Sequence, residues 1–296
     1  MGINRPAMDW IVATFYKFVP LSEPEALRVV LLERCLEWGL RGTILLATEG
    51  LNATVAGNRN SIDQLLAWFH AHPDIGPFPH QEAIATSAPF ERMKVKLKKE
   101  IVTLGQPEVN PAQQPVGIYV DPQNWNQVIA DSEVVLIDAR NDFEVELGTF
   151  RGAVNPQTRS FRDLPDYVAA HLSPAQHKKV AMFCTGGIRC EKATAYMLEQ
   201  GFEQVFHLRG GILNYLKTVP EGSSLWQGDC FVFDERVAVD HRLKPTDHDL
   251  CLGCGHPVSP AEQLAPEYEA GISCPHCYAE LTPEKRSRLE ARQRHR

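Results

Sequence analysis

Four short stretches rich in apolar residues predict strands in the first hundred residues of the chain, at 10–16, 42–47, 51–57 and 93–98. In the last of them apolar residues and lysines alternate. Apolar residues recur at helical spacing after the first strand, namely at Leu27, Val30, Leu31 and Leu36. We expect that helix to begin after Ser22, with Glu25 completing a capping box, and a second helix from Ser61 to about His70. This order of elements is typical of a ferredoxin-like (acylphosphatase-like) α+β domain.

Short, wholly apolar runs replace the alternation in the middle of the chain. They lie at residues 134–138, 180–183 and 204–208, after a polar connection with prolines at 107, 111 and 115. Continuous apolar runs separated by helical stretches indicate parallel strands covered by helices. The sequence therefore predicts an α/β protein with an amino-terminal domain at 1–105, a central domain with a parallel sheet at 115–226, and a small carboxyl-terminal segment at 227–296.

The second apolar run ends at Cys184, in the sequence Cys-Thr-Gly-Gly-Ile-Arg, before a predicted helix. A strand, a glycine turn and a helix in this order direct backbone N–H groups and the positive end of the helix dipole at the sulfur. Arg189 adds a permanent positive charge at the loop exit. We therefore expect Cys184 to be an acidified, nucleophilic thiolate. The alternative is a small buried cysteine beside a glycine turn, but the two glycines and the arginine have no evident packing purpose.

Two Cys-x2-Cys pairs lie near the carboxyl end of the chain. They are Cys251 with Cys254 and Cys274 with Cys277, separated by 19 residues. Two such knuckles supply the four thiolates of a tetrahedral zinc site, and four protein ligands leave no open position, so the metal would be structural. A redox dithiol pair and an iron–sulfur site remain as alternatives. His256 and His276 lie in the same knuckles and could substitute as ligands.

Composition and charge narrow the range of partners. No run approaches the roughly 20 apolar residues of a membrane-spanning helix, and residues 1–20 lack the pattern of an export signal, so we expect a cytoplasmic protein without membrane contact. Eight cysteines in that compartment indicate metal binding or thiol chemistry rather than disulfides. A net charge of −7 argues against binding nucleic acid by overall charge.

Two basic clusters stand apart from that acidic balance. In residues 93–98 the side chains of Lys94, Lys96 and Lys98 alternate with Met93, Val95 and Leu97, which predicts a strand with a basic outer face and an apolar inner face. The chain end at residues 285–296 is the second cluster. Taken alone, both are more simply interpreted as solvated surfaces.

The cysteine loop resembles the active-site loop of rhodanese domains, which hold a sulfur atom as a cysteine persulfide. It has the shorter spacing of that loop, so phosphatase activity is disfavoured. Asp138-Ala139-Arg140, at the end of an apolar run, also looks like a rhodanese feature. The chain as a whole resembles the tRNA uridine hydroxylase family. Four segments carry this resemblance: residues 42–52, Lys94-Val95-Lys96, residues 138–140 and residues 184–192.

That resemblance implies an oxidoreductase that converts the wobble uridine of tRNA to 5-hydroxyuridine with molecular oxygen, with Cys184 essential and Arg189 holding its sulfur anion. With tRNA as partner, an exposed anticodon loop would supply the base, and Lys94, Lys96 and Lys98 would contact phosphates. Arg140 would be a substrate contact or only an ion-pair partner, with Asp138 bracing the loops. Cys190 would be an auxiliary thiol or a packing residue.

The sequence contains no recognisable flavin, haem or nucleotide motif, and no recognisable pair of histidines with a carboxylate. The resemblance implies molecular oxygen as a co-substrate, and the four cysteines predict structural zinc. Two other functions stay open. One is a rhodanese-type sulfurtransferase that moves sulfane sulfur through a cysteine persulfide, and the other is an RNA-binding adaptor without catalytic activity.

Overall fold

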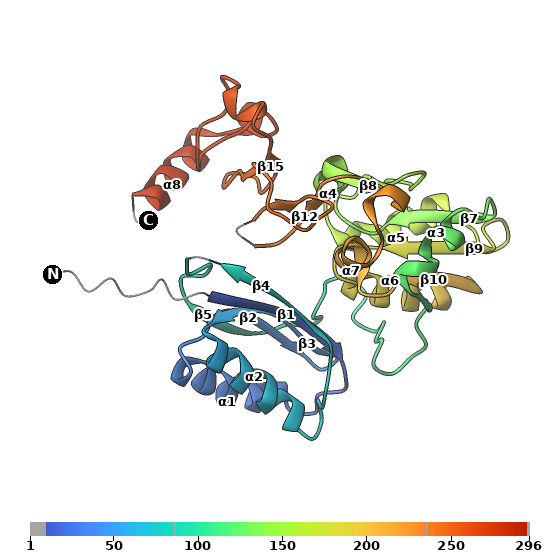
Figure 1. Cartoon of the computed structure of the whole chain (residues 1–296), viewed down its shortest axis with the longest axis horizontal. Coiled ribbons are helices and arrows are strands. Elements are labelled where there is room, and N and C mark those ends of the chain that lie inside the picture. Colours follow the sequence, from blue (N-terminus) through green and yellow to red (C-terminus); the bar gives the residue numbers. More distant parts are fainter. Residues whose placement is uncertain (1–9, 86, 235, 295–296) are drawn as a thin grey trace. The chain divides into compact units, whose positions relative to one another are not determined.

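The computed structural model describes residues 10–85, 87–234 and 236–294, and the chain divides into two compact units (Figure 1). The first unit comprises the chain up to Ile118 together with Ile188–Val205. The second comprises Tyr119–Gly187 and the chain from Phe206 onward. Helix α6 (Ile188–Glu199), which follows the cysteine loop in sequence, thus packs as part of the amino-terminal unit.

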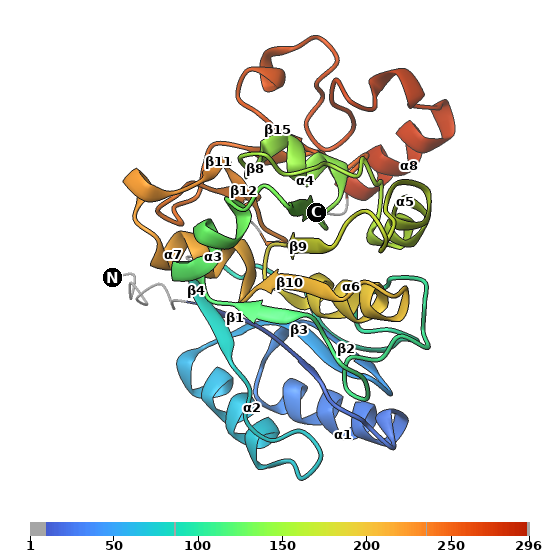
Figure 2. The same cartoon turned by 90° about the vertical axis from the view of Figure 1, so that its right-hand side faces the viewer.

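The first unit is built on a five-stranded sheet in the order β4-β1-β3-β2-β5. The strands are β1 (Trp10–Phe18), β2 (Arg41–Ala47), β3 (Gly50–Gly57), β4 (His80–Ala85) and β5 (Met93–Leu97). All pairs are antiparallel except β2 with β5, where Ile44 lies opposite Val95. Helices α1 (Pro24–Glu37) and α2 (Arg59–Ala71) cover one face of this sheet (Figures 1 and 2). The predicted ferredoxin-like fold is confirmed, but its last strand is β4 beside β1, and the strand predicted at 93–98 is instead a fifth strand, β5, parallel to β2.

Strand β4 was not among the predicted strands. Its sequence, His-Gln-Glu-Ala-Ile-Ala, forms an edge strand beside β1, and its Ile84 side chain is exposed. An edge strand with neither face fully buried has few apolar residues, so neither an alternating pattern nor a continuous apolar run marks it in the sequence.

The prediction for α1 was wrong in two details. The helix begins at Pro24 after Glu23, without a side-chain cap from Ser22, because proline supplies a preset φ and has no N–H group to satisfy. Its buried face carries Leu31 and Cys35, whereas Val30 and Leu36 are 46% and 60% exposed. Apolar residues thus lie on both sides of this helix, and the chosen set mixed its two faces.

A second sheet has the order β6-β10-β9-β7, and most of its residues belong to the second unit. These strands are β6 (Ile118–Val120), β7 (Val134–Asp138), β9 (Lys179–Phe183) and β10 (Gln204–Leu208). β7 and β9 are parallel, as predicted from their continuous apolar sequences. The helices of this unit are α3 (Pro122–Ile129), α4 (Asp142–Leu147), α5 (Leu164–His171) and α7 (Gly211–Thr218). Its core is aromatic, with Phe150 in edge contact with Trp125, Phe183, Tyr215 and Trp226.

Three short two-stranded sheets complete the second unit. β8 (Gly148–Phe150) pairs with β11 (Trp226–Gly228), β12 (Cys230–Phe231) with β13 (Ala238–Val239), and β14 (Asp249–Leu250) with β15 (Pro257–Val258). The chain ends in helix α8 (Pro283–Gln293), and Arg296 of the basic tail lies outside the described residues. The α/β fold class with a carboxyl-terminal cysteine cluster is confirmed. Across the described ranges, the search found no helix with the length and apolarity to cross a bilayer.

Candidate functional site

The loop after β9 holds Cys184 in a buried position, with 1% of its surface exposed. The Gly187 N–H donates a hydrogen bond to the Cys184 sulfur, with the nitrogen and sulfur 3.1 Å apart. Gly187 has a φ of +101°, a conformation that residues with a side chain rarely adopt. A sulfur that accepts an N–H bond is favoured in its anionic form. The Cys184 sulfur thus has at least one main-chain donor, as a thiolate in this loop would require.

The start of α7 fixes the other side of the loop. The Ile212 and Leu213 N–H groups donate to the carbonyl oxygens of Cys184 and Thr185, at 2.9 and 3.1 Å. A Cβ atom on Gly211 would lie 2.4 Å from the Cys184 oxygen. Glycine is therefore required for this approach. Sequence reasoning overlooked Gly211, although a Gly-Gly pair directly after a predicted strand signals close contact between main chains.

Helix α4 braces the loop through Glu144, whose side chain is fully buried. The Thr185 hydroxyl donates to one carboxylate oxygen of Glu144 at 3.3 Å, and the Asn141 N–H donates to the other at 3.1 Å. Thr185 and Glu144 are 41 residues apart in the chain, so this contact could not be read from the sequence.

Arg140 and Asp138 form an ion pair with no exposed side-chain surface. Two parallel hydrogen bonds of 2.8 and 2.6 Å join the guanidinium to the carboxylate. The guanidinium also donates to the carbonyl oxygens of Glu144 and Gly148, and Thr149 donates to Asp138. Burial opposes the charge, but the Asp138 carboxylate outweighs it and the pKa of Arg140 is raised. This geometry favours the ion-pair alternative for Arg140 over a substrate contact.

Helix α6 carries Arg189, Cys190 and Lys192, all buried. The Lys192 ammonium lies between two buried carboxylates of the same unit, 2.6 Å from Glu49 and 2.9 Å from Glu100. Burial raises the pKa of Glu49, against the lowering effect of Lys192. Sequence reasoning gave Lys192 no role. It had no distinct signal in the sequence, because Lys192 follows two other charged residues, Arg189 and Glu191, in the first turns of α6.

Lys94 and Lys96 lie in strand β5, and Lys98 comes directly after it. This strand forms one edge of the first sheet. Lys96 and Lys98 are exposed and Lys94 is half-buried, so the predicted basic face is present. On the opposite face Met93 and Val95 are buried, but Leu97 is 39% exposed. Leu97 is the last residue of the strand, and the predicted apolar inner face ends before it.

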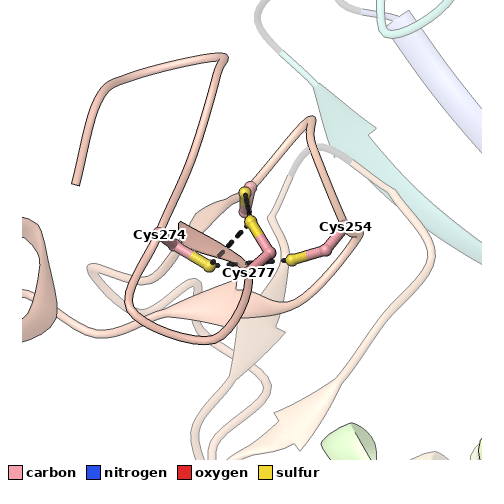
Figure 3. Close-up of side chains that lie close together, drawn as sticks. Cys254, Cys274 and Cys277 are labelled. Atoms are coloured by element: carbon pink, nitrogen blue, oxygen red, sulfur yellow. Dashed lines mark hydrogen bonds between the residues drawn. The ribbon is translucent and has the colours of Figure 1, made fainter. Parts of the chain in front are cut away.

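The sulfur atoms of the four carboxyl-terminal cysteines turn toward one another (Figure 3). Sulfur–sulfur distances are 3.8 Å for Cys251 to Cys277, 3.6 Å for Cys254 to Cys274, and 3.9 Å for Cys274 to Cys277. A tetrahedron of thiolates around zinc, with bonds of about 2.3 Å, has edges of about 3.8 Å. The thiol of Cys254 helps lower the pKa of Cys251 to about 5. Donor type and spacing therefore fit a four-sulfur metal site.

A second group near these knuckles was not anticipated. Glu146, His256 and His276 place one possible ligand atom each within 4.8 Å of the others. The two imidazole rings are stacked, with centroids 4.5 Å apart and an interplanar angle of 15°. An ion bound in the plane of one ring cannot also lie in the plane of a ring stacked parallel to it. We therefore assign this group to packing between α4 and the cysteine segment.

Comparison with known proteins places this architecture in a family. The model of the UPF0176 acylphosphatase like domain matches residues 10–101, and that of the Rhodanese-like domain matches residues 121–218. A tRNA uridine(34) hydroxylase of Picosynechococcus is 51% identical over 96% of this chain and 95% of its own length. One from Teredinibacter turnerae is 54% identical over 97% of this chain and 89% of its own. This chain belongs to the tRNA uridine(34) hydroxylase family.

Membership in the tRNA uridine(34) hydroxylase family confirms the resemblance carried by residues 42–52, 94–96, 138–140 and 184–192. Among solved structures, the rhodanese-like domain of an Anabaena protein matches 37% of the length of this chain and 78% of the length of that domain. The TM-score is 0.32 and the sequence identity 18%. That likeness is too slight to carry an argument about function.

Proposed function

We propose that this protein hydroxylates carbon 5 of the wobble uridine in tRNA, with molecular oxygen as co-substrate. The observation that carries the proposal is a buried cysteine whose sulfur accepts a main-chain N–H, in a chain more than 50% identical to two tRNA uridine(34) hydroxylases over nearly its whole length. Uracil is electrophilic at carbon 6, so a fixed thiolate is the group that its activation requires.

In the proposed reaction the Cys184 thiolate adds to carbon 6 of uracil, and the electron pair of the 5,6 double bond moves onto carbon 5 and the ring carbonyl. Carbon 5 then attacks oxygen and becomes a hydroperoxide. A two-electron reductant, such as a thiol that leaves as a disulfide, cleaves the O–O bond and releases water. Loss of the carbon 5 proton expels the thiolate and gives 5-hydroxyuridine. The net change is uridine, oxygen, two electrons and two protons to 5-hydroxyuridine and water.

Each candidate residue has a part in this proposal. The Gly187 N–H and the Arg189 guanidinium hold the sulfur anion, and Arg189 also stabilises charge that moves onto the ring. Arg140 acts as a positioning residue through Asp138 rather than as a substrate contact. The basic face of β5, with Lys94, Lys96 and Lys98, contacts tRNA phosphates. Cys190 is fully buried, which favours packing over a role as a resolving thiol.

We further propose that Cys251, Cys254, Cys274 and Cys277 hold a structural zinc ion. When bound there, zinc would link the two knuckles and supply folding free energy to a segment with few apolar residues of its own. Four cysteine ligands would leave no position for substrate.

The source of the new oxygen atom tests this proposal. Purified protein and unmodified tRNA, with a thiol reductant, should form 5-hydroxyuridine that carries the label when the gas phase is ¹⁸O₂. The Cys184→Ala variant should form none. Label that arrives from H₂¹⁸O instead would contradict the proposed attack on oxygen. Sulfur transfer from thiosulfate without any tRNA hydroxylation would favour the sulfurtransferase alternative.

A further inference from the structure

The main chain after β10 is held rigidly beside the cysteine loop. The Arg209 N–H donates to the Val120 carbonyl at 2.9 Å, and the Asn214 amide donates to the Arg209 carbonyl at 2.9 Å. Gly210 and Gly211 follow with φ values of +70° and +66°. The main-chain N–H and carbonyl of Arg209 are therefore both hydrogen-bonded, and these bonds fix the position of its Cβ atom.

That place is close to the reactive cysteine. Gly211 lies against the Cys184 carbonyl, since a Cβ atom on it would be 2.4 Å from that oxygen. Arg209 is two residues earlier, which is at most about 7 Å of chain. An arginine side chain spans a similar length, so its guanidinium can reach a nucleotide whose base is bound at Cys184.

The guanidinium of Arg209 is oriented but remains accessible. Its Nε atom donates to Asp121 at 2.6 Å, and its plane lies over the ring of Tyr119 with the central carbon 4.6 Å from the ring centroid. The side chain is 52% exposed. Among the described residues, the structure gives its two terminal nitrogens no hydrogen-bond acceptor.

An exposed ion pair of this kind contributes little to folding. Its arrangement is instead that of a preorganised anion-binding group. Asp121 and Tyr119 fix the plane of the Arg209 guanidinium, and its terminal N–H groups are available to bind a ligand. A guanidinium fork matches the two oxygens of a phosphodiester. The protein carries a net charge of −7, so a fixed cation beside the reactive loop changes the local potential for RNA.

We propose that Arg209 binds the backbone phosphodiester next to the uridine that enters the Cys184 loop, with Tyr119 and Asp121 as its positioning residues. This subsite rests on the proposed function, because it needs an RNA substrate at Cys184. It assigns a phosphate contact to the second unit, separate from the three lysines of β5 in the first.

The test compares Arg209→Gln and Arg209→Lys with a matched control, Arg242→Gln. Arg242 is also an exposed arginine in an ion pair, with Glu221, and its neighbours Leu216 to Glu221 lie at the carboxyl end of α7, away from Gly211. Arg209→Gln should raise the KM for tRNA about tenfold or more with little change in kcat. The slope of log affinity against log salt should fall by about 0.7, the value for one phosphate on a single strand.

Arg209→Lys should keep the salt slope but recover only part of the affinity, because an ammonium keeps the charge and loses the fork. Arg242→Gln should leave KM and slope unchanged. Unaltered KM and slope in Arg209→Gln, with wild-type rates of Cys184 alkylation and a wild-type urea midpoint, would overturn the inference. If wild-type protein binds tRNA but does not hydroxylate it, the proposed function fails, and the salt slopes still decide the Arg209 contact.

Discussion

The residues that prepare Cys184 act mainly through main-chain geometry. Its sulfur receives the Gly187 N–H, while its carbonyl is held by α7. The sequence order of strand, cysteine, two glycines and helix predicted the N–H group at the sulfur, because that part of the loop is local, but it did not predict the contact with α7. The contacts of Thr185 with Glu144, and of Lys192 with Glu49 and Glu100, join residues distant in sequence. No local pattern encodes such pairs, and the sequence did not reveal them.

Lys192→Met tests the buried charge cluster. Loss of the ammonium leaves Glu49 and Glu100 buried without a cation, and removal of one partner from a buried ion pair costs about 3–5 kcal/mol of unfolding free energy. Urea denaturation at neutral pH measures this change. Lys179→Met is a matched control, because Lys179 pairs with Asp131 and Glu133 at the surface and should alter stability little.

The deficit of Lys192→Met should depend on pH. Burial already raises the pKa of Glu49 above its ordinary value of 4.5, and loss of Lys192 removes a lowering influence. A carboxyl with a raised pKa in the folded state favours folding at low pH, and this contribution is lost as pH rises through that pKa. The difference from wild type should therefore shrink as pH falls toward 4.5 and grow above it. A deficit that is constant with pH would show that lost packing, not charge, is responsible.

At the scale of elements, the packing of α7 against the loop after β9 depends on Gly211. Gly211→Ala would force an unfavourable φ and a Cβ contact of 2.4 Å with the Cys184 oxygen, so the loop must shift. We expect the rate of Cys184 alkylation and the hydroxylation rate to change together, with a loss of unfolding free energy above about 1 kcal/mol.

Gly152→Ala is the control for that substitution. Gly152 has a φ of +82°, but a Cβ atom there would meet nothing within 4 Å. It should lose stability through backbone strain while the Cys184 alkylation rate stays at the wild-type value. Equal alkylation rates in both variants would show that Gly211 does not set the loop geometry.

Elements with one well-buried apolar face were predictable, and elements without one were not. β7 and β9 were predicted from continuous apolar sequence and are parallel. β4 was missed because it is an edge strand with few buried residues, and the residues predicted for the buried face of α1 included Val30 and Leu36, which are exposed. These failures arise from tertiary position, which decides whether an apolar side chain is covered.

At the scale of the whole molecule, the domain boundaries expected at 1–105, 115–226 and 227–296 stay a prediction. The two compact units differ from a linear division, since α6 is part of the first unit although its sequence lies inside the region matched by the rhodanese-like model. The sequence does not show that α6 belongs to the first unit, because this assignment depends on contacts between residues far apart in the chain, such as that of Lys192 with Glu49.

The carboxyl-terminal cysteine segment should depend on metal for its fold. Cys274→Ser removes one of four thiolates, so zinc content should fall from about one ion per chain, and residues 249–294 should become sensitive to protease. Metal analysis and limited proteolysis measure both effects, and a chelator should reproduce them in the wild-type protein. Cys35→Ser, at a buried cysteine of the first unit, should leave the zinc content unchanged. Protease resistance without metal would contradict a structural ion.

The most direct test of the account is nucleoside mass spectrometry of tRNA from cells that lack this protein and carry either the intact gene or the Cys184→Ala form. We predict that 5-hydroxyuridine and its derivatives disappear in the deletion, return with the intact gene and do not return with Cys184→Ala. A strain with a second route to the same base would be tested with that route deleted as well. Full restoration by Cys184→Ala would contradict the central claim that this cysteine performs the reaction.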